Sequence, residues 1–241
     1  MVEKNLFRTL APKSHRMKKR FFFTIFVFCA FLSVADAQQA LRDSLVKASE
    51  ALEWRPDSVH LRLKKAAWNV ELQQWDYAKD EYDKVLTLDP DNPAALYYRA
   101  YVNQQMGRYK FSRADYEHLL RIVPGNFNGL LGLALLNDKD HKKTEALDQM
   151  NRLVEQFPDS AVAYAARAGM ERDRGLLELA EYDFTEALHR DAGNTDYLLA
   201  RADLRLLMNR KREAREDLDR LVTLGISRAA LADFYVRLKN K

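Results

Sequence analysis

The chain has 241 residues and a formal net charge of +4, from 39 Lys or Arg against 35 Asp or Glu. Seven of the basic and two of the acidic residues lie within residues 1–37, so the rest of the chain holds 32 basic against 33 acidic residues. Nucleic-acid binding needs a concentrated positive surface, so we expect no nucleic-acid partner. The single cysteine, Cys29, lies in the same segment, which excludes a disulfide framework.

The N-terminal segment has the pattern of a secretory signal peptide. Basic residues at positions 18–20 precede an apolar run over 21–34, and the small-residue sequence Ala-Asp-Ala ends at Ala37. We therefore expect cleavage after Ala37. The region before the apolar run is long for a signal peptide, and the sequence leaves open whether translation starts at Met1 or at Met17.

The apolar run is too short for a membrane anchor. It holds about fourteen residues, whereas a helix that spans a bilayer needs roughly twenty. We expect no transmembrane segment in the mature chain, and we expect the protein to be exported to the periplasm or the cell surface. The absence of cysteine from the mature chain favours a bacterial periplasm over a eukaryotic secretory route.

Residues 38–58 are expected to form an N-terminal capping helix. Apolar residues recur at helical spacing from Leu41 to Leu52, and the segment ends at Pro56. Pro56 is in phase with a 34-residue repeat that follows. The segment therefore corresponds to the second helix of a truncated repeat, and we expect it to cap the stack.

Five 34-residue repeats fill residues 59–226. Each starts just after a turn in which proline, or alanine in the last case, precedes Asp-Ser, Asp-Asn or Gly-Asn, residues that end one helix and cap the next. We number the repeats as hairpins one to five. They begin at Val59, Pro93, Phe127, Ala161 and Thr195.

Two helices are expected in each repeat, joined by a short turn that glycine marks in hairpins two and four, at Gly107 and Gly175. The expected first helices lie near residues 59–72, 93–106, 127–140, 161–174 and 195–208. The expected second helices lie near residues 74–88, 108–122, 142–156, 176–189 and 210–223.

Small residues recur at two fixed places, the eighth and the twentieth residue of each repeat, whereas the twenty-fourth is large and apolar. A larger side chain at the small places would hold the helix axes apart, so two helices should cross closely there. The small residues are Ala66, Ala78, Ala100, Ser112, Ala134, Ala146, Ala168, Ala180, Ala202 and Ala214. The large ones are Tyr82, Tyr116, Met150, Phe184 and Leu218.

This pattern resembles the tetratricopeptide repeat, whose 34-residue signature has a small eighth and twentieth residue, an aromatic twenty-fourth and a proline near the end. The resemblance covers residues 59 to about 224. It implies an all-α fold, a right-handed α-solenoid of about five helical hairpins with a capping helix at each end. The eleventh residue, often Tyr in the family, departs from the pattern and is Asn69, Asn103, Asn137, Glu171 or Arg205.

The resemblance also implies a binding surface. In the family, the second, fifth, ninth and twelfth residues of each repeat line a concave groove. Here the lining would mix aromatic, apolar and neutral polar groups and lacks the basic set with which some members hold acidic peptides. The candidate residues for peptide binding are Leu63, Tyr97, Tyr101, Gln104, Asn128, Leu131, Leu135 and Arg172.

The seventh and twenty-third residues of a repeat are either both charged or both uncharged. Hairpin three has Leu133 with Gln149, whereas the other four hairpins have a basic residue with an acidic one. We interpret these as ion pairs between the two helices of a hairpin, because the loss of one partner alone would leave a partly buried charge uncompensated. The predicted pairs are Lys65 with Glu81, Arg99 with Asp115, Arg167 with Asp183 and Arg201 with Asp217.

Residues 227–241 are expected to form a C-terminal capping helix. Ser227 is a suitable N-cap, and apolar residues recur at helical spacing up to Leu238. No Gly-, Ser- or Pro-rich linker interrupts residues 38–241, which predicts one continuous domain.

No catalytic, cofactor-binding or metal site is expected. The histidines fall at unrelated places of different repeats, and phosphate-cradling loops and nucleophile motifs are absent from the sequence. Asp138, Asp140 and His141 crowd one turn, where polar residues are the commoner explanation than a metal site.

The predicted function is a non-enzymatic scaffold or adaptor that binds a protein or peptide. Tyr97 and Tyr101 are the preferred anchors, because tyrosine offers a large apolar face and a polar tip; packing against neighbouring hairpins explains them equally well. The alternative is a structural subunit of a larger envelope assembly that uses convex or terminal surfaces. The sequence identifies neither the partner nor the oligomeric state.

Overall fold

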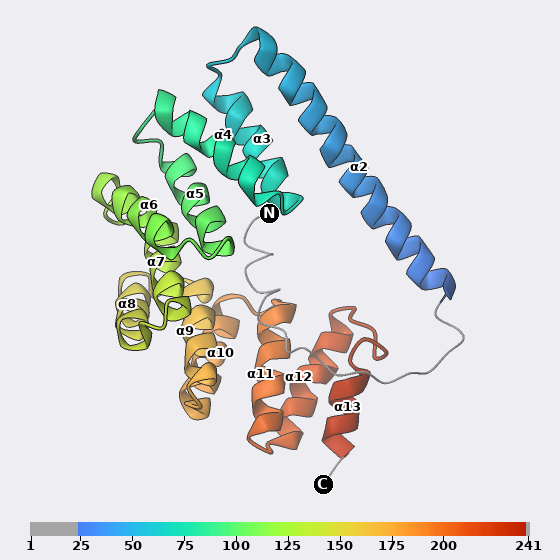
Figure 1. Ribbon diagram of the computed structural model, residues 1–241. Coiled ribbons are helices and arrows are strands. Elements are labelled where there is room, and N and C mark those ends of the chain that lie inside the picture. Colours follow the sequence, from blue (N-terminus) through green and yellow to red (C-terminus); the bar gives the residue numbers. More distant parts are fainter. Residues whose placement is uncertain (1–23, 240–241) are drawn as a thin grey trace. The chain divides into compact units, whose positions relative to one another are not determined.

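The computed structural model describes residues 24–239, and the side chains from residue 38 onward. Within that range the chain forms twelve helices and no strand (Figure 1). The helices of hairpins one to three are α3 (Val59–Glu71), α4 (Trp75–Leu88), α5 (Pro93–Gln105), α6 (Tyr109–Ile122), α7 (Phe127–Lys139) and α8 (Lys143–Gln156). Those of hairpins four and five are α9 (Ala161–Asp173), α10 (Leu177–Arg190), α11 (Thr195–Leu207) and α12 (Lys211–Thr223), with α2 (Thr24–Trp54) before and α13 (Ala232–Lys239) after the repeats.

Side-chain caps start the first helix of every hairpin. In each case a Ser or Asn oxygen accepts a hydrogen bond from the backbone N–H three residues further on, at 2.8 to 3.4 Å. The capping residues are Ser58, Asn92, Asn126, Ser160 and Asn194. The turn residues that the sequence analysis placed before each repeat therefore fix where its first helix begins.

The turn inside each hairpin passes through the left-handed region at the fifteenth residue. Gly107 and Gly175 adopt φ of 72° and 75° there. Gln73, His141 and Asn209 occupy the same place with φ of 58° to 62°. Glycine takes this conformation without steric cost, whereas a residue with a Cβ is strained by it.

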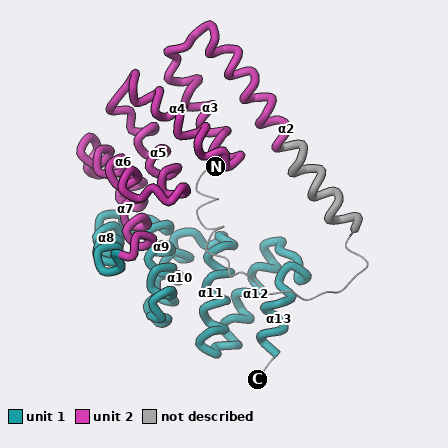
Figure 2. Tube along the Cα trace, viewed as in Figure 1, with its two compact units in different colours: residues 1–13, 142–241 teal, residues 14–141 magenta. Residues whose placement is uncertain are grey.

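Helices pack sequentially within two compact units (Figure 2). Among the described residues, one unit holds 24–141, with α2 to α7, and the other holds 142–239, with α8 to α13. In each unit every helix contacts the next one along the chain. The boundary falls in the turn of hairpin three, where the sequence analysis predicted a continuous domain. The all-α solenoid of helical hairpins is confirmed, and the right-handed sense of the whole array stays a prediction.

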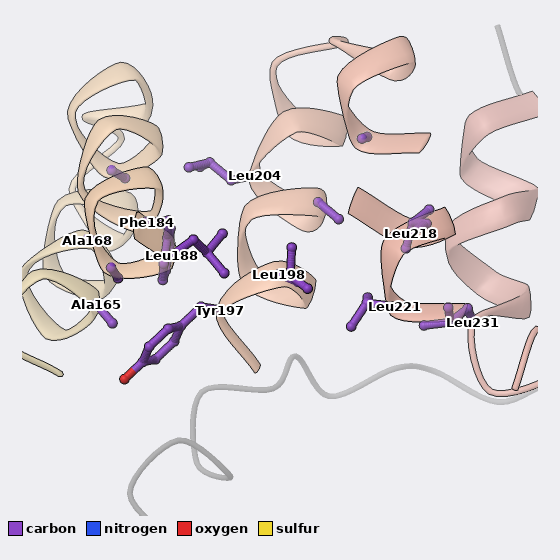
Figure 3. Close-up of a cluster of buried hydrophobic side chains, with 14 of the residues drawn as sticks. Ala165, Ala168, Phe184, Leu188, Tyr197, Leu198, Leu204, Leu218, Leu221 and Leu231 are labelled. Carbon is purple, nitrogen blue, oxygen red and sulfur yellow. The ribbon is translucent and has the colours of Figure 1, made fainter. Parts of the chain in front are cut away.

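The residues at the eighth and twentieth places are completely buried in all five hairpins, with exposed fractions of 0%. Large side chains fill the space between the helices. In the second unit, Phe184 and Leu188 of α10 pack with Leu198 of α11 and Leu218 of α12 (Figure 3). In the first unit, Tyr82 and Tyr116 are buried in the same role.

Of the described glycines, Gly132 in α7 lies closest to a neighbouring side chain. A Cβ added there would lie 2.5 Å from the ring of Tyr116, which is itself only 2% exposed. Glycine is required at this place because the ring of Tyr116 occupies the space that a methyl group would need.

The two ends of the array differ from the expected boundaries. The predicted N-terminal capping segment overlaps α2 over residues 38–54, but α2 begins earlier, at Thr24, and ends at Trp54 rather than at residue 58; its Ala48 and Leu52 are buried. Residues 1–23 of the predicted leader lie outside the described residues, and cleavage after Ala37 stays a prediction. Between residues 24 and 239, no helix combines the length and the apolar character needed to span a membrane.

The predicted C-terminal helix starts later than expected. Residues 228–231 form turns, and α13 begins at Ala232 rather than at Ser227. The Ser227 hydroxyl does accept a hydrogen bond from the N–H of Ala230, but it closes a turn. Leu231 and Leu238 are buried all the same, so the segment covers the last hairpin.

Candidate functional site

The structure brings together the partners of all four predicted ion pairs. Arg99 donates two hydrogen bonds to the carboxylate of Asp115, at 2.6 and 2.9 Å. Arg167 with Asp183 and Arg201 with Asp217 repeat this bidentate geometry, at 2.6 to 3.1 Å. The carboxylates are buried, so the guanidinium group supplies the charge and the hydrogen bonds that water would otherwise give.

Hairpin one uses several cations for the same purpose. Lys65 lies 3.2 Å from the carboxylate of Glu81, and Arg62 donates to it at 2.7 Å. Burial opposes ionisation of Glu81, but the hydrogen bonds from Arg62 and Lys65 outweigh burial and hold its pKa below the usual value. Glu81 therefore stays charged and paired.

Each of the three arginines also reaches the preceding hairpin, which the sequence analysis did not foresee. The second acceptors are Asp83 for Arg99, Asn151 for Arg167 and Thr185 for Arg201, at 2.7 to 3.2 Å. All three occupy the twenty-fifth place of the preceding repeat. Comparing that place with the seventh place of the next repeat would have revealed the link, since each acceptor is polar. The arginine joins two neighbouring hairpins as well as two helices.

The candidate peptide-binding residues divide between the units. Arg172 lies in the second unit, where it donates to Asp173. The other seven lie in the first unit, on α3, α5 and α7, and α5 contacts both of the other first helices. We call these seven residues the first-helix face: Leu63, Tyr97, Tyr101, Gln104, Asn128, Leu131 and Leu135.

The first-helix face is only partly accessible. Gln104 and Leu131 are buried, with exposed fractions of 8% and 5%, so they act as core residues. Asn128 is exposed, and the remaining members, Leu63, Tyr97, Tyr101 and Leu135, are half-buried.

Tyr97 and Tyr101 each pack one part of the ring and leave another part exposed. Tyr101 meets Trp75 edge to face, with ring centroids 6.2 Å apart. Tyr97 makes the same type of contact with Tyr98 at 5.0 Å and tilts against Tyr116 at 6.1 Å. Burial raises the pKa of Tyr101. The ring contacts show that both tyrosines are packing residues, and their role as anchors for a partner stays a prediction.

The second helices carry the most exposed aromatic side chains of the repeats. Tyr77 of α4 and Phe111 of α6 occupy the nineteenth place of their repeats and are 68% and 67% exposed. Leu179 holds the same place on α10, in the other unit, and is also exposed. Tyr77 and Phe111 thus give the first unit exposed apolar side chains on its second helices, distinct from the first-helix face.

In residues 24–239, no group of three or more His, Cys, Asp or Glu side chains is placed to hold a metal ion. In the turn of hairpin three, Asp140 pairs with Arg113 at 2.9 Å. The Asp140 carboxylate is therefore paired with an arginine of its own unit.

Comparison with known proteins agrees with this geometry. A tetratricopeptide repeat family model matches residues 129–160. A TPR repeat-containing protein of Rhizobium etli is 29% identical over 115 residues, which are 46% of this chain and 56% of the relative. The match thus spans little more than half the length of that relative.

Solved structures show the same fold. A tetratricopeptide repeat protein from Parabacteroides merdae superposes with a TM-score of 0.71 at 20% identity, over 86% of this chain and 81% of the other. PilW, a type IV pilus biogenesis factor, gives 0.67 at 20% identity, over 80% and 90%. The repeat register, the buried small residues, the family-model match over residues 129–160 and the solved structures agree on one fold, that of stacked tetratricopeptide-type helical hairpins.

Proposed function

We propose that this chain is a non-enzymatic scaffold that binds a protein or peptide on the first-helix face, in the bacterial periplasm or envelope. Stacked helical repeats present extended surfaces for partners, and tetratricopeptide repeats generally serve in this way. The observation that carries the proposal is the half-exposed pair Tyr97 and Tyr101 on α5, held in place by neighbouring rings.

Rings that are already oriented suit an anchor role. Tyrosine loses little conformational entropy on binding, and it combines an apolar face with a hydroxyl group. Tyr97 and Tyr101 lose less still, because Trp75 and Tyr98 restrict them before any partner arrives. Exposed Asn128 adds a polar group on the same face.

Export is supported by the sequence alone. The basic, apolar and small-residue segments that end at Ala37 are those of a signal peptide. Fractionation of cells that express the full chain, with N-terminal sequencing of the product, tests it: a periplasmic protein that begins at Gln38 is expected. An uncleaved chain in the cytosol would contradict it.

A surface substitution tests the binding face without removing core packing. Ala67 is exposed on α3, at the place that Tyr101 occupies on α5. Ala67→Arg adds bulk and charge on α3, which contacts α5, and Ala114→Arg, on the exposed side of α6, is the matched control. Pull-down from envelope fractions with the full chain is expected to lose a partner with Ala67→Arg and to retain it with Ala114→Arg.

The Tyr97 and Tyr101 double alanine variant then tests the anchors directly. Because both rings pack against neighbours, its circular dichroism spectrum must first match that of the native chain. A partner retained by a folded double variant would contradict the anchor role.

A specific observation favours the alternative, a subunit of a larger envelope assembly. Tyr77 and Phe111 are exposed aromatic side chains at the same place of successive second helices, α4 and α6. If the Tyr77→Ala and Phe111→Ala double variant loses the partner while Ala67→Arg retains it, the second-helix surface is the interface.

A further inference from the structure

The eleventh residue of a hairpin faces the acidic residue at the twenty-third place. In hairpin two, the amide nitrogen of Asn103 lies 3.5 Å from a carboxylate oxygen of Asp115. In hairpin five, Arg205 donates to Asp217 at 2.8 Å. In both cases an N–H donor on the first helix points at a buried carboxylate on the second.

In hairpin four, the eleventh residue is an acid, Glu171, where hairpins two and five have an N–H donor. Glu171 is 6% exposed, and its Oε2 is buried without a hydrogen-bond partner. Its carboxyl group interacts with that of Asp183, which is 1% exposed and accepts from Arg167 with both oxygens, at 2.6 and 2.8 Å. An ionised carboxylate has no hydrogen to donate, whereas a protonated one does.

The charged groups around Glu171 do not supply a second cation for it. On its own helix, Arg167 is engaged by Asp183 and by Asn151. Arg174, just after α9, donates to the backbone carbonyls of Met170 and Lys143. Both arginines act on Glu171 only through space, and they lower its pKa by less than burial and Asp183 raise it.

The preceding helix, α8, offers no charge at the matching place. In hairpin five, Arg205 also bonds Glu181, at the twenty-first place of hairpin four, with 2.7 Å between them. For Glu171 the corresponding residue of α8 is the apolar Leu147. Nothing at this register position favours an ionised Glu171.

We propose that Glu171 is protonated in the folded protein and donates a hydrogen bond to Asp183, so that a proton holds α9 against α10 and the hairpin loosens as the pH rises. The shared proton belongs to Glu171 because Arg167 occupies Asp183 as an acceptor. The proposal does not rest on the proposed partner binding, since Glu171 and Asp183 belong to the second unit, whereas Tyr97 and Tyr101 belong to the first.

Burial, followed by the negative charge of Asp183, raises the pKa of Glu171 from 4.5 to about 7. A carboxyl group with a raised pKa takes up a proton on folding between these two values. Stability from this group is therefore complete below about pH 4.5, falls as the pH rises, and is lost above about pH 7.

The first test compares unfolding midpoints in urea at about pH 5.5 and about pH 8.5. Glu171→Gln replaces the protonated carboxyl by an amide of the same shape that donates at every pH. Glu155→Gln, at an exposed site on α8, is the matched control. Between the lower and the higher pH, the urea concentration at the unfolding midpoint is expected to fall more for the native chain and the control than for Glu171→Gln. Parallel pH profiles of the native chain and Glu171→Gln would overturn the proposal.

The second test is needed in case Glu171→Gln fails to fold. An NMR titration of isotope-labelled glutamate carboxyl carbons in the native full chain is expected to show one glutamate with a midpoint near pH 7. If every glutamate titrates below about pH 5, as free glutamate does, the proposal is wrong.

Discussion

The hairpins α5–α6 and α9–α10 share the same arginine arrangement but differ in what surrounds it. In both, the arginine at the seventh place binds a buried aspartate with two hydrogen bonds. The eleventh residue is neutral Asn103 in one hairpin and Glu171 in the other. One hairpin therefore satisfies its aspartate at any pH, whereas the other depends on a proton.

The two hairpins also differ on their first helices. The fifth and ninth residues are Tyr97 and Tyr101 in α5, whereas α9 has Ala165 and Gly169, which are both buried. The repeat framework fixes the arginine contacts, and the residues that vary around it give one hairpin an aromatic surface and the other an ionisable interior. Hairpins with the same backbone can thus be specialised separately.

The largest expected effect is the removal of the arginine. Above about pH 7, where Glu171 is ionised, Arg167→Ala should cost about 3–5 kcal/mol of unfolding free energy, because it leaves the buried Asp183 without a cation beside a second carboxylate. Arg99→Ala should cost less, because Asn103 still donates to Asp115. Urea unfolding measures both, and an equal or larger loss for Arg99→Ala would contradict the role of the eleventh residue.

The next largest effect is expected when a carboxyl group is introduced at the eleventh place of hairpin two, which should make the stability of that hairpin depend on pH. Asn103→Glu places a carboxyl group against Asp115, so it should cost about 2 kcal/mol at high pH and recover most of that when the carboxyl is protonated at low pH. Unfolding curves at both pH values check this. Asn103→Gln keeps the amide donor and controls for the longer side chain, so the same pH profile in both variants would refute the expectation.

The smallest effects concern the turns. Gly107 and Gly175 already suit the left-handed conformation in these two hairpins, whereas Gln73 adopts it in hairpin one. Gln73→Gly should stabilise the chain by about 0.5–1 kcal/mol, and Gly175→Ala should destabilise it by about 1 kcal/mol. Thermal unfolding of both variants is the measurement, and shifts of the same sign would show that φ does not decide the difference.

The sequence predicted the fold through features that are local or strictly periodic. Capping residues such as Ser58 and Asn92 set the helix starts, and the alanines at two fixed places set the helix crossings. The start of α13 was wrong, because helical spacing of apolar residues does not distinguish a turn closed by Ser227 from a helix that begins there.

The candidate site was harder to predict, because it depends on neighbours in other helices. The exposure of Tyr97 and Tyr101 is set by Trp75 and Tyr98, and the periodicity of α5 alone does not include those contacts. Gln104 was assigned to the surface and is buried, whereas the twelfth residues of the other four repeats are half-buried. From the sequence, Glu171 stood out only as a departure from the family pattern. Its contact with Asp183 could not be predicted, because it depends on how α9 packs against α10.

Tyr116 and Gly132 form a pair that mutation can change only together. A methyl group at position 132 would collide with the tyrosine ring, whereas in the second unit Phe184, which lacks the hydroxyl group, packs in a cluster that includes Ala200. A library that varies one position at a time would report both residues as intolerant. A library that varies them jointly should recover combinations of a smaller side chain at position 116 with Gly132→Ala, which would show that the two positions vary together.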